Sequence, residues 1–229
     1  MPKVLIAVTS CERQANRGIF TGYDLSEVSH PYLVFRDAGY EVKFVSPKGG
    51  TPPIEKYTLS DPISRAFLED EDAQARIRTS YQAQELNPRD YVGLFFAGGH
   101  GTLWDFPDDR SLQSLTANIY LAGGVIGAVC QGLAGLLNIR LPGGSYLVTR
   151  RYLHSLAPDA EVSAQSALPL RLKASLEAQG ALFRQALPGS RQVEVSERLV
   201  TSQNSDAAER IARVMVELLQ GTRCLPRAS

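Results

Sequence analysis

Cys130 is the residue whose position points most directly to chemistry. It follows the apolar run GVIGAV (Gly124–Val129), and Gln131-Gly132 separates it from a helix expected to begin at Leu133. A sharp turn from strand to helix pushes its central side chain out of the sheet, and the start of a helix stabilises a thiolate. We therefore expect a nucleophilic thiol whose pKa lies below the ordinary ~8.5. The alternative is a buried cysteine that packs as a small apolar side chain.

A glycine-rich loop follows another expected strand. Its sequence, GGHG, comes directly after Tyr91–Ala97 (YVGLFFA). Three glycines let the backbone approach a ligand and direct N–H groups at a developing negative charge, although tight strand-to-helix turns have the same composition. The spacing matches neither a dinucleotide fingerprint nor a phosphate-binding P-loop. We expect the oxyanion and the substrate to be bound by Gly98, Gly99, His100, Gly101 and Gly132.

Glu27 is the candidate acid of this site. It lies on an expected amphipathic helix, one position from the apolar stripe. Burial would keep its carboxyl protonated, so that it could donate a hydrogen bond to the Cys130 sulfur. The alternative is a glutamate on the solvated face of the helix.

Other catalytic arrangements find little support in the sequence. The chain has three histidines, His30, His100 and His154, and neither an HExxH nor a CxxC motif, so we expect no metal site. The GxSxG motif of serine hydrolases is also absent. Cys11 follows the first expected strand and is either a resolving thiol for Cys130 or an inert loop cysteine.

Composition limits the class of protein. The 229 residues carry 24 basic and 24 acidic side chains, so the basic excess typical of nucleic-acid binding is missing. No apolar run approaches the ~20 residues of a membrane span, and the start of the chain lacks the pattern of a signal peptide. Three cysteines are too few for a disulfide framework. We expect a soluble, cytoplasmic protein with one domain over residues 1–220 and a frayed tail over 221–229.

Strands alternate with helices along the chain, which predicts an α/β fold with a parallel sheet between two helical layers. The expected strands are Val4–Val8, Glu41–Val45, Tyr91–Ala97, Gly124–Val129, one or two within Leu147–Ala164, and a hairpin of Val193–Val195 with Leu199–Thr201. The expected helices are Leu25–Phe35, segments of Ala66–Leu86, Ser111–Leu121, Leu133–Leu137, Leu168–Gln179 and Asp206–Leu219. Asp24 is a possible cap of the first helix, which Pro31 should kink or shift. In such sheets the chemistry lies at the carboxyl ends of the strands, where Cys130 and the GGHG loop fall.

Three segments together resemble the ThiJ/PfpI superfamily of class I glutamine amidotransferase-like proteins. They are AVCQG around Cys130, AGGHGTLWDFPDD from Ala97, and SEVSHPYLVFRDAGYEVKFVSPKGG from Ser26. The similarity is greatest to the branch of heat-shock chaperones and glutathione-independent glyoxalases (glyoxalase III). The resemblance implies a flavodoxin-like, doubly wound sandwich, often a homodimer. It implies no cofactor, and a small carbonyl compound or related electrophile as substrate.

The resemblance also assigns roles to residues. Cys130 matches the family nucleophile and Glu27 the carboxylate beside it. Gln131 stands where active members have the histidine of a triad, and Glu161, or else Asp159, matches its downstream acid. An amide does not titrate, so we expect weak or altered conversion of methylglyoxal to lactate, unless His154 supplies a relocated imidazole. The alternative function is a non-catalytic redox sensor or a holdase-type stress chaperone.

Overall fold

The fold is built on a six-stranded sheet with the strand order β3-β1-β5-β6-β10-β9. The computed structural model describes residues 1–13, 18–57, 59–155, 171–185 and 192–223. The strands are β1 (Lys3–Ala7), β3 (Glu41–Val45), β5 (Tyr91–Phe96), β6 (Val125–Val129), β9 (Glu194–Ser196) and β10 (Leu199–Ser202). The first five strands in this order are parallel, and β9 pairs antiparallel with β10 as the hairpin prediction requires. Five parallel strands in this order form a flavodoxin-like doubly wound sheet, so the predicted fold class is confirmed.

The central strands are buried on both faces, which explains their continuous apolar sequences. All five residues of β6 are buried, and Val4, Leu5, Ile6 and Ala7 have no exposed surface. Alternate side chains of each strand enter opposite halves of the core, since successive residues point to opposite faces. In β1, Ile6 belongs to one half and Leu5 to the other.

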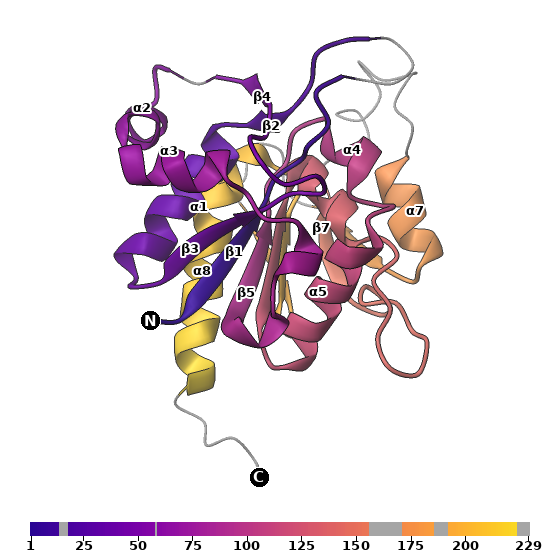
Figure 1. The fold of residues 1–229 in the computed structure, drawn as a ribbon. Helices are drawn as coiled ribbons and strands as arrows, with labels where there is room; N and C mark the ends of the chain where they lie inside the picture. Colours follow the sequence, from indigo (N-terminus) through magenta and orange to yellow (C-terminus); the bar gives the residue numbers. More distant parts are fainter. Residues whose placement is uncertain (14–17, 58, 156–170, 186–191, 224–229) are drawn as a thin grey trace.

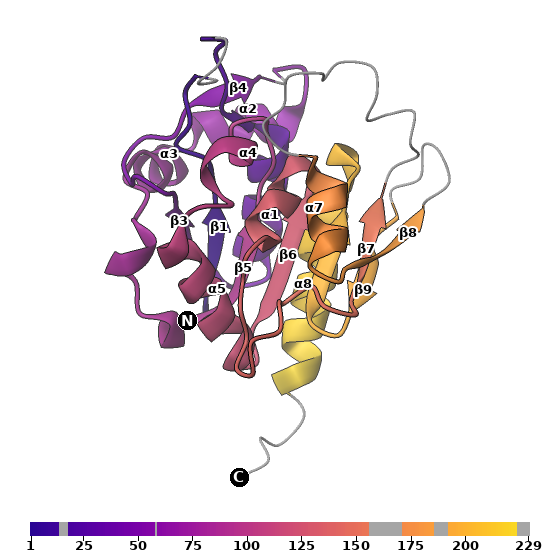
Figure 2. The same cartoon turned by 90° about the vertical axis from the view of Figure 1, so that its right-hand side faces the viewer.

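Helices cover both faces of the sheet (Figures 1 and 2). One face packs against α1 (Ser26–Asp37) and α8 (Ala208–Arg223), and the other against α5 (Arg110–Leu121) and α7 (Leu172–Ala178). The expected shift of α1 at Pro31 does not occur, because the helix starts at Ser26 and runs through the proline. Leu25, not Asp24, occupies the cap position. Asp24 still fixes the helix start, because its Oδ1 accepts hydrogen bonds from the Ser26 N–H (2.9 Å) and hydroxyl (2.7 Å).

The segment between β3 and β5 contributes small elements near the carboxyl ends of the strands. β4 (Ile54–Lys56) pairs in parallel with β2 (Tyr23–Asp24), which leads into α1. The helices α2 (Pro62–Glu69) and α3 (Glu71–Arg78) and the short helices η1 (Ala83–Glu85) and η2 (Pro88–Asp90) follow. In Figure 1, β2, β4 and α4 (Thr102–Asp105) lie together beyond the carboxyl end of β1. This end of the sheet therefore has a rim built from several segments.

Some predictions about local structure need correction, and others concern residues outside the described part of the chain. The helix expected from Leu133 is a 3-10 helix, η3 (Cys130–Leu136), which begins at the cysteine itself. A second small sheet pairs β7 (Tyr152–Ser155) in parallel with β8 (Leu182–Gln185). After η4 (Ser205–Ala207), α8 extends to Arg223, so the first three residues of the expected frayed tail are helical.

Residues 156–170 and 224–229, with Asp159, Glu161 and Cys224, lie outside the described residues. In the part of the chain that the structure describes, no helix is long and apolar enough to span a membrane.

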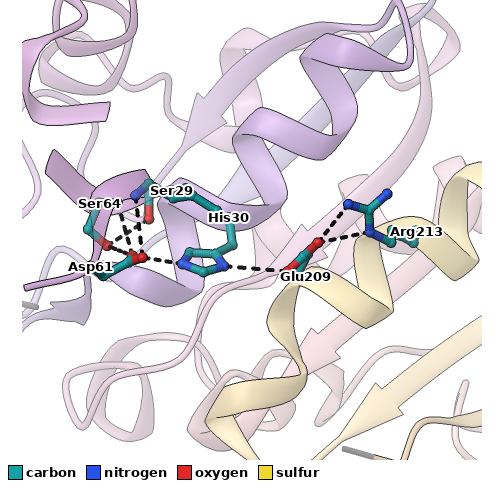
Figure 3. Close-up of polar contacts among 7 residues, drawn as sticks. Ser29, His30, Asp61, Ser64, Glu209 and Arg213 are labelled. Atoms are coloured by element: carbon teal, nitrogen blue, oxygen red, sulfur yellow. Dashed lines mark hydrogen bonds and ion pairs between the residues drawn. The ribbon is translucent and has the colours of Figure 1, made fainter. Parts of the chain in front are cut away.

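A polar cluster connects α1, α2 and α8 on one side of the sheet (Figure 3). The His30 Nε2 lies 2.8 Å from the Asp61 Oδ2, and its Nδ1 lies 3.9 Å from the Glu209 carboxylate. Asp61 caps α2 by accepting hydrogen bonds from the Ser64 N–H (3.0 Å) and hydroxyl (2.6 Å). Partial burial raises the pKa of Asp61, but the bonds from Ser64 and His30 outweigh it and lower this pKa to about 2.

Asp61→Ala should therefore lower the free energy of unfolding by about 1–2 kcal/mol at pH 7, because α2 loses its cap and His30 its partner. A carboxyl with a depressed folded pKa stabilises the fold above its unfolded pKa of ~3.9. The difference should shrink as the pH falls toward 2. Urea unfolding at several pH values measures it, with the exposed Asp37→Ala as the control. Equal stability of the Asp61 and Asp37 variants at pH 7 would contradict this role.

Candidate active site

Cys130 lies in a strained turn at the carboxyl end of β6. Its φ is 53°, in the left-handed region that L-residues rarely adopt. Gly132 permits this turn, since a Cβ there would clash with the Phe96 carbonyl of the neighbouring strand. Cys130 as a residue is half-buried at this end of the sheet. This arrangement matches the elbow predicted from the sequence.

Two side chains lie next to the Cys130 thiol. The thiol lies 2.6 Å from the Gln131 Oε1, which accepts its proton in a hydrogen bond. The Glu27 carboxyl from α1 lies on the other side, since a Cβ at Gly98 would meet both the Glu27 Oε2 and the Cys130 Cβ. The fold thus brings together Cys130 and Glu27, which are 103 positions apart in the sequence, as expected.

Glu27 is a buried carboxyl with only 1% of its surface exposed. Its Oε2 accepts a hydrogen bond of 2.8 Å from the Gly98 N–H. Burial, with the negative charge of Asp24 as a second cause, raises the pKa of Glu27 to about 8. Near neutral pH the carboxyl is therefore mostly protonated and can donate its hydrogen to the sulfur, as the sequence analysis anticipated.

The electrostatics of Cys130 differ from the prediction. Burial and the neighbouring Glu27 raise the pKa of the thiol, and the backbone N–H of Gln131, which lowers it, does not compensate. The expected decrease required the positive end of an α-helix, but η3 is a short 3-10 helix. The amide oxygen of Gln131 does not favour a negative charge on the sulfur, and the Glu27 carboxyl opposes that charge once it is ionised. The resting nucleophile is therefore a thiol.

Alkylation of Cys130 by iodoacetamide should accordingly be slow at pH 7 and rise steeply above pH 8, since the thiolate is the reactive form. Glu27 loses its proton near this pH, and its carboxylate then opposes ionisation of the thiol. Glu27→Gln removes that charge, so the labelling profile should move to lower pH. Mass spectrometry of the Cys130 peptide measures the rate, with the exposed Glu12→Gln as the matched control. A wild-type midpoint below pH 7 would contradict this interpretation.

The GGHG loop contacts the cysteine, but two of its amides are already engaged. A Cβ at Gly98 would clash with Glu27 and lie 3.1 Å from the Cys130 Cβ, so only glycine fits there. The Gly98 N–H is donated to Glu27 and the His100 N–H to Glu55, so the expectation that both bind an oxyanion is wrong. Gly99, with a φ of 118°, makes no N–H hydrogen bond within the described part of the chain. Gly99 and Gly101, whose N–H makes no hydrogen bond within these residues either, are the remaining candidate donors of this loop.

Glu55 is a residue of this rim that the sequence analysis missed. Its Oε1 lies 2.7 Å from the His100 Nδ1, and its Oε2 accepts the His100 N–H at 2.8 Å. Burial raises the pKa of Glu55, but the hydrogen bonds from His100 outweigh it and the net pKa is lowered. The hydrogen bond to Glu55 raises the pKa of His100. The sequence holds one weak signal for this pair, an isolated acid in the turn-rich segment TPPIEK.

The other candidate residues, Cys11 and His154, have hydrogen-bond partners other than the groups around the Cys130 sulfur. The Cys11 carbonyl would lie 2.9 Å from a Cβ at Gly101, so its loop borders the GGHG loop, while its thiol donates to the Arg13 carbonyl at 3.3 Å. His154 is buried, and its Nδ1 accepts the Gln203 N–H at 3.2 Å. Among the described residues, no group of histidine, cysteine, aspartate and glutamate could hold a metal ion.

The chain belongs to the DJ-1/PfpI family. The model of that family matches residues 18–218, and the doubly wound sheet and the cysteine at its carboxyl end agree with the resemblance drawn from the sequence. Glyoxalase 3 of Candida albicans is 35% identical over 153 residues, which cover 62% of this chain and 63% of that protein. The glutathione-independent glyoxalase hsp3101 of Schizosaccharomyces pombe is 29% identical over 222 residues, 90% of this chain and 91% of that protein.

Solved structures show the same fold. Rapid encystment protein REP24 of Francisella tularensis superimposes with a TM-score of 0.89 at 30% identity, over 96% of this chain and 99% of that chain. Glyoxalase III of Candida albicans superimposes with a TM-score of 0.83 at 26% identity, over 95% of this chain and 97% of that chain.

Proposed function

We propose that this chain is a cysteine-dependent, glutathione-independent glyoxalase that acts on small 2-oxoaldehydes such as methylglyoxal. The placement of the Glu27 carboxyl and the Cys130 thiol around Gly98 carries the proposal, because it sets an acid beside a nucleophile at the open end of the sheet. The related proteins named as glyoxalases support the substrate class. The site needs no free thiol as a cofactor, since Cys130 itself can form the adduct.

The first step adds the Cys130 thiol across the aldehyde carbonyl of the substrate. The sulfur forms a bond to C1, and the π electrons of the C1–O bond move to the oxygen. Protonated Glu27 can donate its proton to that oxygen while the carboxyl takes up the proton of the thiol. This exchange lets a thiol with a raised pKa react without first becoming a free thiolate. The product is a hemithioacetal on Cys130, with Glu27 protonated as before.

The second step moves a proton from C1 to the neighbouring carbon C2, and here Gln131 limits the reaction. A carboxamide can orient a substrate by hydrogen bonds but cannot take up a proton near neutral pH. Loss of a positioned general base typically lowers a rate by ~10²–10⁴-fold. We therefore infer weaker turnover than in a site with histidine at this position. Roles of Glu161 or Asp159 in this step stay predictions.

The test is lactate formation from methylglyoxal without glutathione, followed by proton NMR. Lactate formed in proportion to enzyme, together with a mass increase on Cys130 from the trapped adduct, is the expected result. Neither lactate nor adduct would overturn the proposal. The redox-sensor and chaperone alternatives, the homodimer and the cytoplasmic location likewise stay predictions.

A further inference from the structure

An imidazole is available at this site despite the amide at position 131. The chain has three histidines in all. His30 is held in the cluster of α1, α2 and α8, and His154 has only 3% of its surface exposed. His100 is the remaining one. Its side chain is 36% exposed, so it can meet a small molecule at the rim.

The position of His100 is fixed on both sides by contacts with the nucleophile turn. Two residues before it, the Gly98 position is in van der Waals range of the Cys130 Cβ. Two residues after it, the Thr102 hydroxyl donates to the Gln131 carbonyl at 2.9 Å. The loop that carries His100 is thus anchored to Cys130 at one end and to Gln131 at the other. His100 is thus two residues away from each of two contacts with the nucleophile turn.

The orientation of the ring is fixed by Glu55. One carboxylate oxygen binds the ring Nδ1 and the other binds the backbone N–H of the same residue. The Thr21 hydroxyl donates to Glu55 at 3.2 Å and restrains it in turn. A carboxylate on Nδ1 selects the tautomer with its proton there and leaves a lone pair on Nε2, which is the role of the acid in a catalytic triad. No described residue forms a hydrogen bond with the His100 Nε2.

The geometry points to His100 as the general base and acid that carries the proton from C1 to C2 of the Cys130 adduct, with Glu55 as its positioning residue. This inference rests on the proposed function and identifies how the site can work with glutamine at position 131. It requires the neutral imidazole as the starting form. The hydrogen bond to Glu55 raises the pKa of His100, so the base should lose its function as the pH falls through that raised value.

The step is balanced within the adduct. Nε2 takes the C1 proton, the C1–H electron pair becomes the C1–C2 double bond, and the C2 carbonyl electrons move to its oxygen. The imidazolium then gives the proton to C2, while the hydroxyl proton on C1 passes to the C2 oxygen. C1 becomes the carbonyl of a lactyl thioester on Cys130. Water adds to this carbonyl and the thiol leaves, so methylglyoxal and water give lactate with no external oxidant or reductant.

The experiment compares His100→Gln with the control His30→Gln. His30 is the other imidazole paired with a carboxylate, and it lies in the cluster of α1, α2 and α8. We expect His100→Gln to lower kcat for lactate formation by roughly 10²-fold or more. The rate of Cys130 alkylation in this variant should stay within ~threefold of wild type, a difference of less than 1 kcal/mol. His30→Gln should retain wild-type kcat. Imidazole added to His100→Gly should restore part of the lost turnover. Full activity of His100→Gln would overturn the inference and leave the proposed function standing.

Glu55→Gln tests the positioning role through the pH dependence of kcat. At saturating substrate the sulfur is already bonded to C1. The fall of kcat at low pH, the acid limb of the profile, therefore reports the pKa of the base rather than that of the thiol. Without the Glu55 charge the pKa of His100 falls, and the acid limb should move to lower pH while kcat decreases. A limb that does not move would overturn the assignment. If wild type forms neither adduct nor lactate, the proposed function fails and this inference fails with it.

Discussion

Cys130→Ala should abolish lactate formation from methylglyoxal, with a loss of roughly 10³-fold or more in kcat/KM. The reason is that every later step takes place on the carbon bonded to the Cys130 sulfur, so no remaining group can replace it. The fold should tolerate the change, because it removes a single sulfur atom from a half-buried residue and alanine occupies less volume. Proton NMR of lactate and intact-mass detection of the adduct give two independent measurements.

Cys11→Ala is the matched control for this variant, since Cys11 is the other free cysteine within the described chain. Its thiol hydrogen-bonds to the Arg13 carbonyl and not to the groups around Cys130. We expect unchanged turnover and an unchanged adduct on Cys130. If Cys130→Ala keeps a tenth of the wild-type rate, covalent catalysis by this residue is wrong, whatever the control shows.

The local features of the site could be predicted because they depend on short stretches of sequence. The apolar run before Cys130 and the glycine after the next residue define the turn without any long-range information. Glu27 could be proposed as the acid from its place next to the apolar stripe of its helix and from the family resemblance, but its distance to Cys130 depends on how α1 packs on the sheet. Its burial and raised pKa follow from that packing.

What the sequence could not supply is the balance of charges around the sulfur. The expected thiolate depended on an α-helix after Cys130, but residues 130–136 form a 3-10 helix, and burial then dominates the pKa. The engagement of the Gly98 and His100 amides also depends on acids from distant segments. Glu55 was missed for the same reason, since β4 pairs with β2 only once the chain has folded around the carboxyl end of the sheet.

Gln131→His should raise kcat for lactate formation by roughly 10²-fold. The side chain at position 131 already lies in hydrogen-bonding distance of the Cys130 sulfur, at 2.6 Å. An amide oxygen there can only accept the thiol proton in a hydrogen bond, whereas imidazole can take the proton and stabilise the thiolate as an ion pair. Iodoacetamide labelling of Cys130 at pH 7 should therefore accelerate at least ~10-fold in the same variant.

Gln131→Asn separates the effect of titration from that of shape, since it keeps a carboxamide and should bring no gain. The combination of Gln131→His with His100→Gln makes the sharper comparison. If the new imidazole takes over the proton transfer, loss of His100 should cost less in that background than in wild type, as expected for two groups that share one role. A Gln131→His variant within twofold of wild type would show that the amide at position 131 does not limit the reaction.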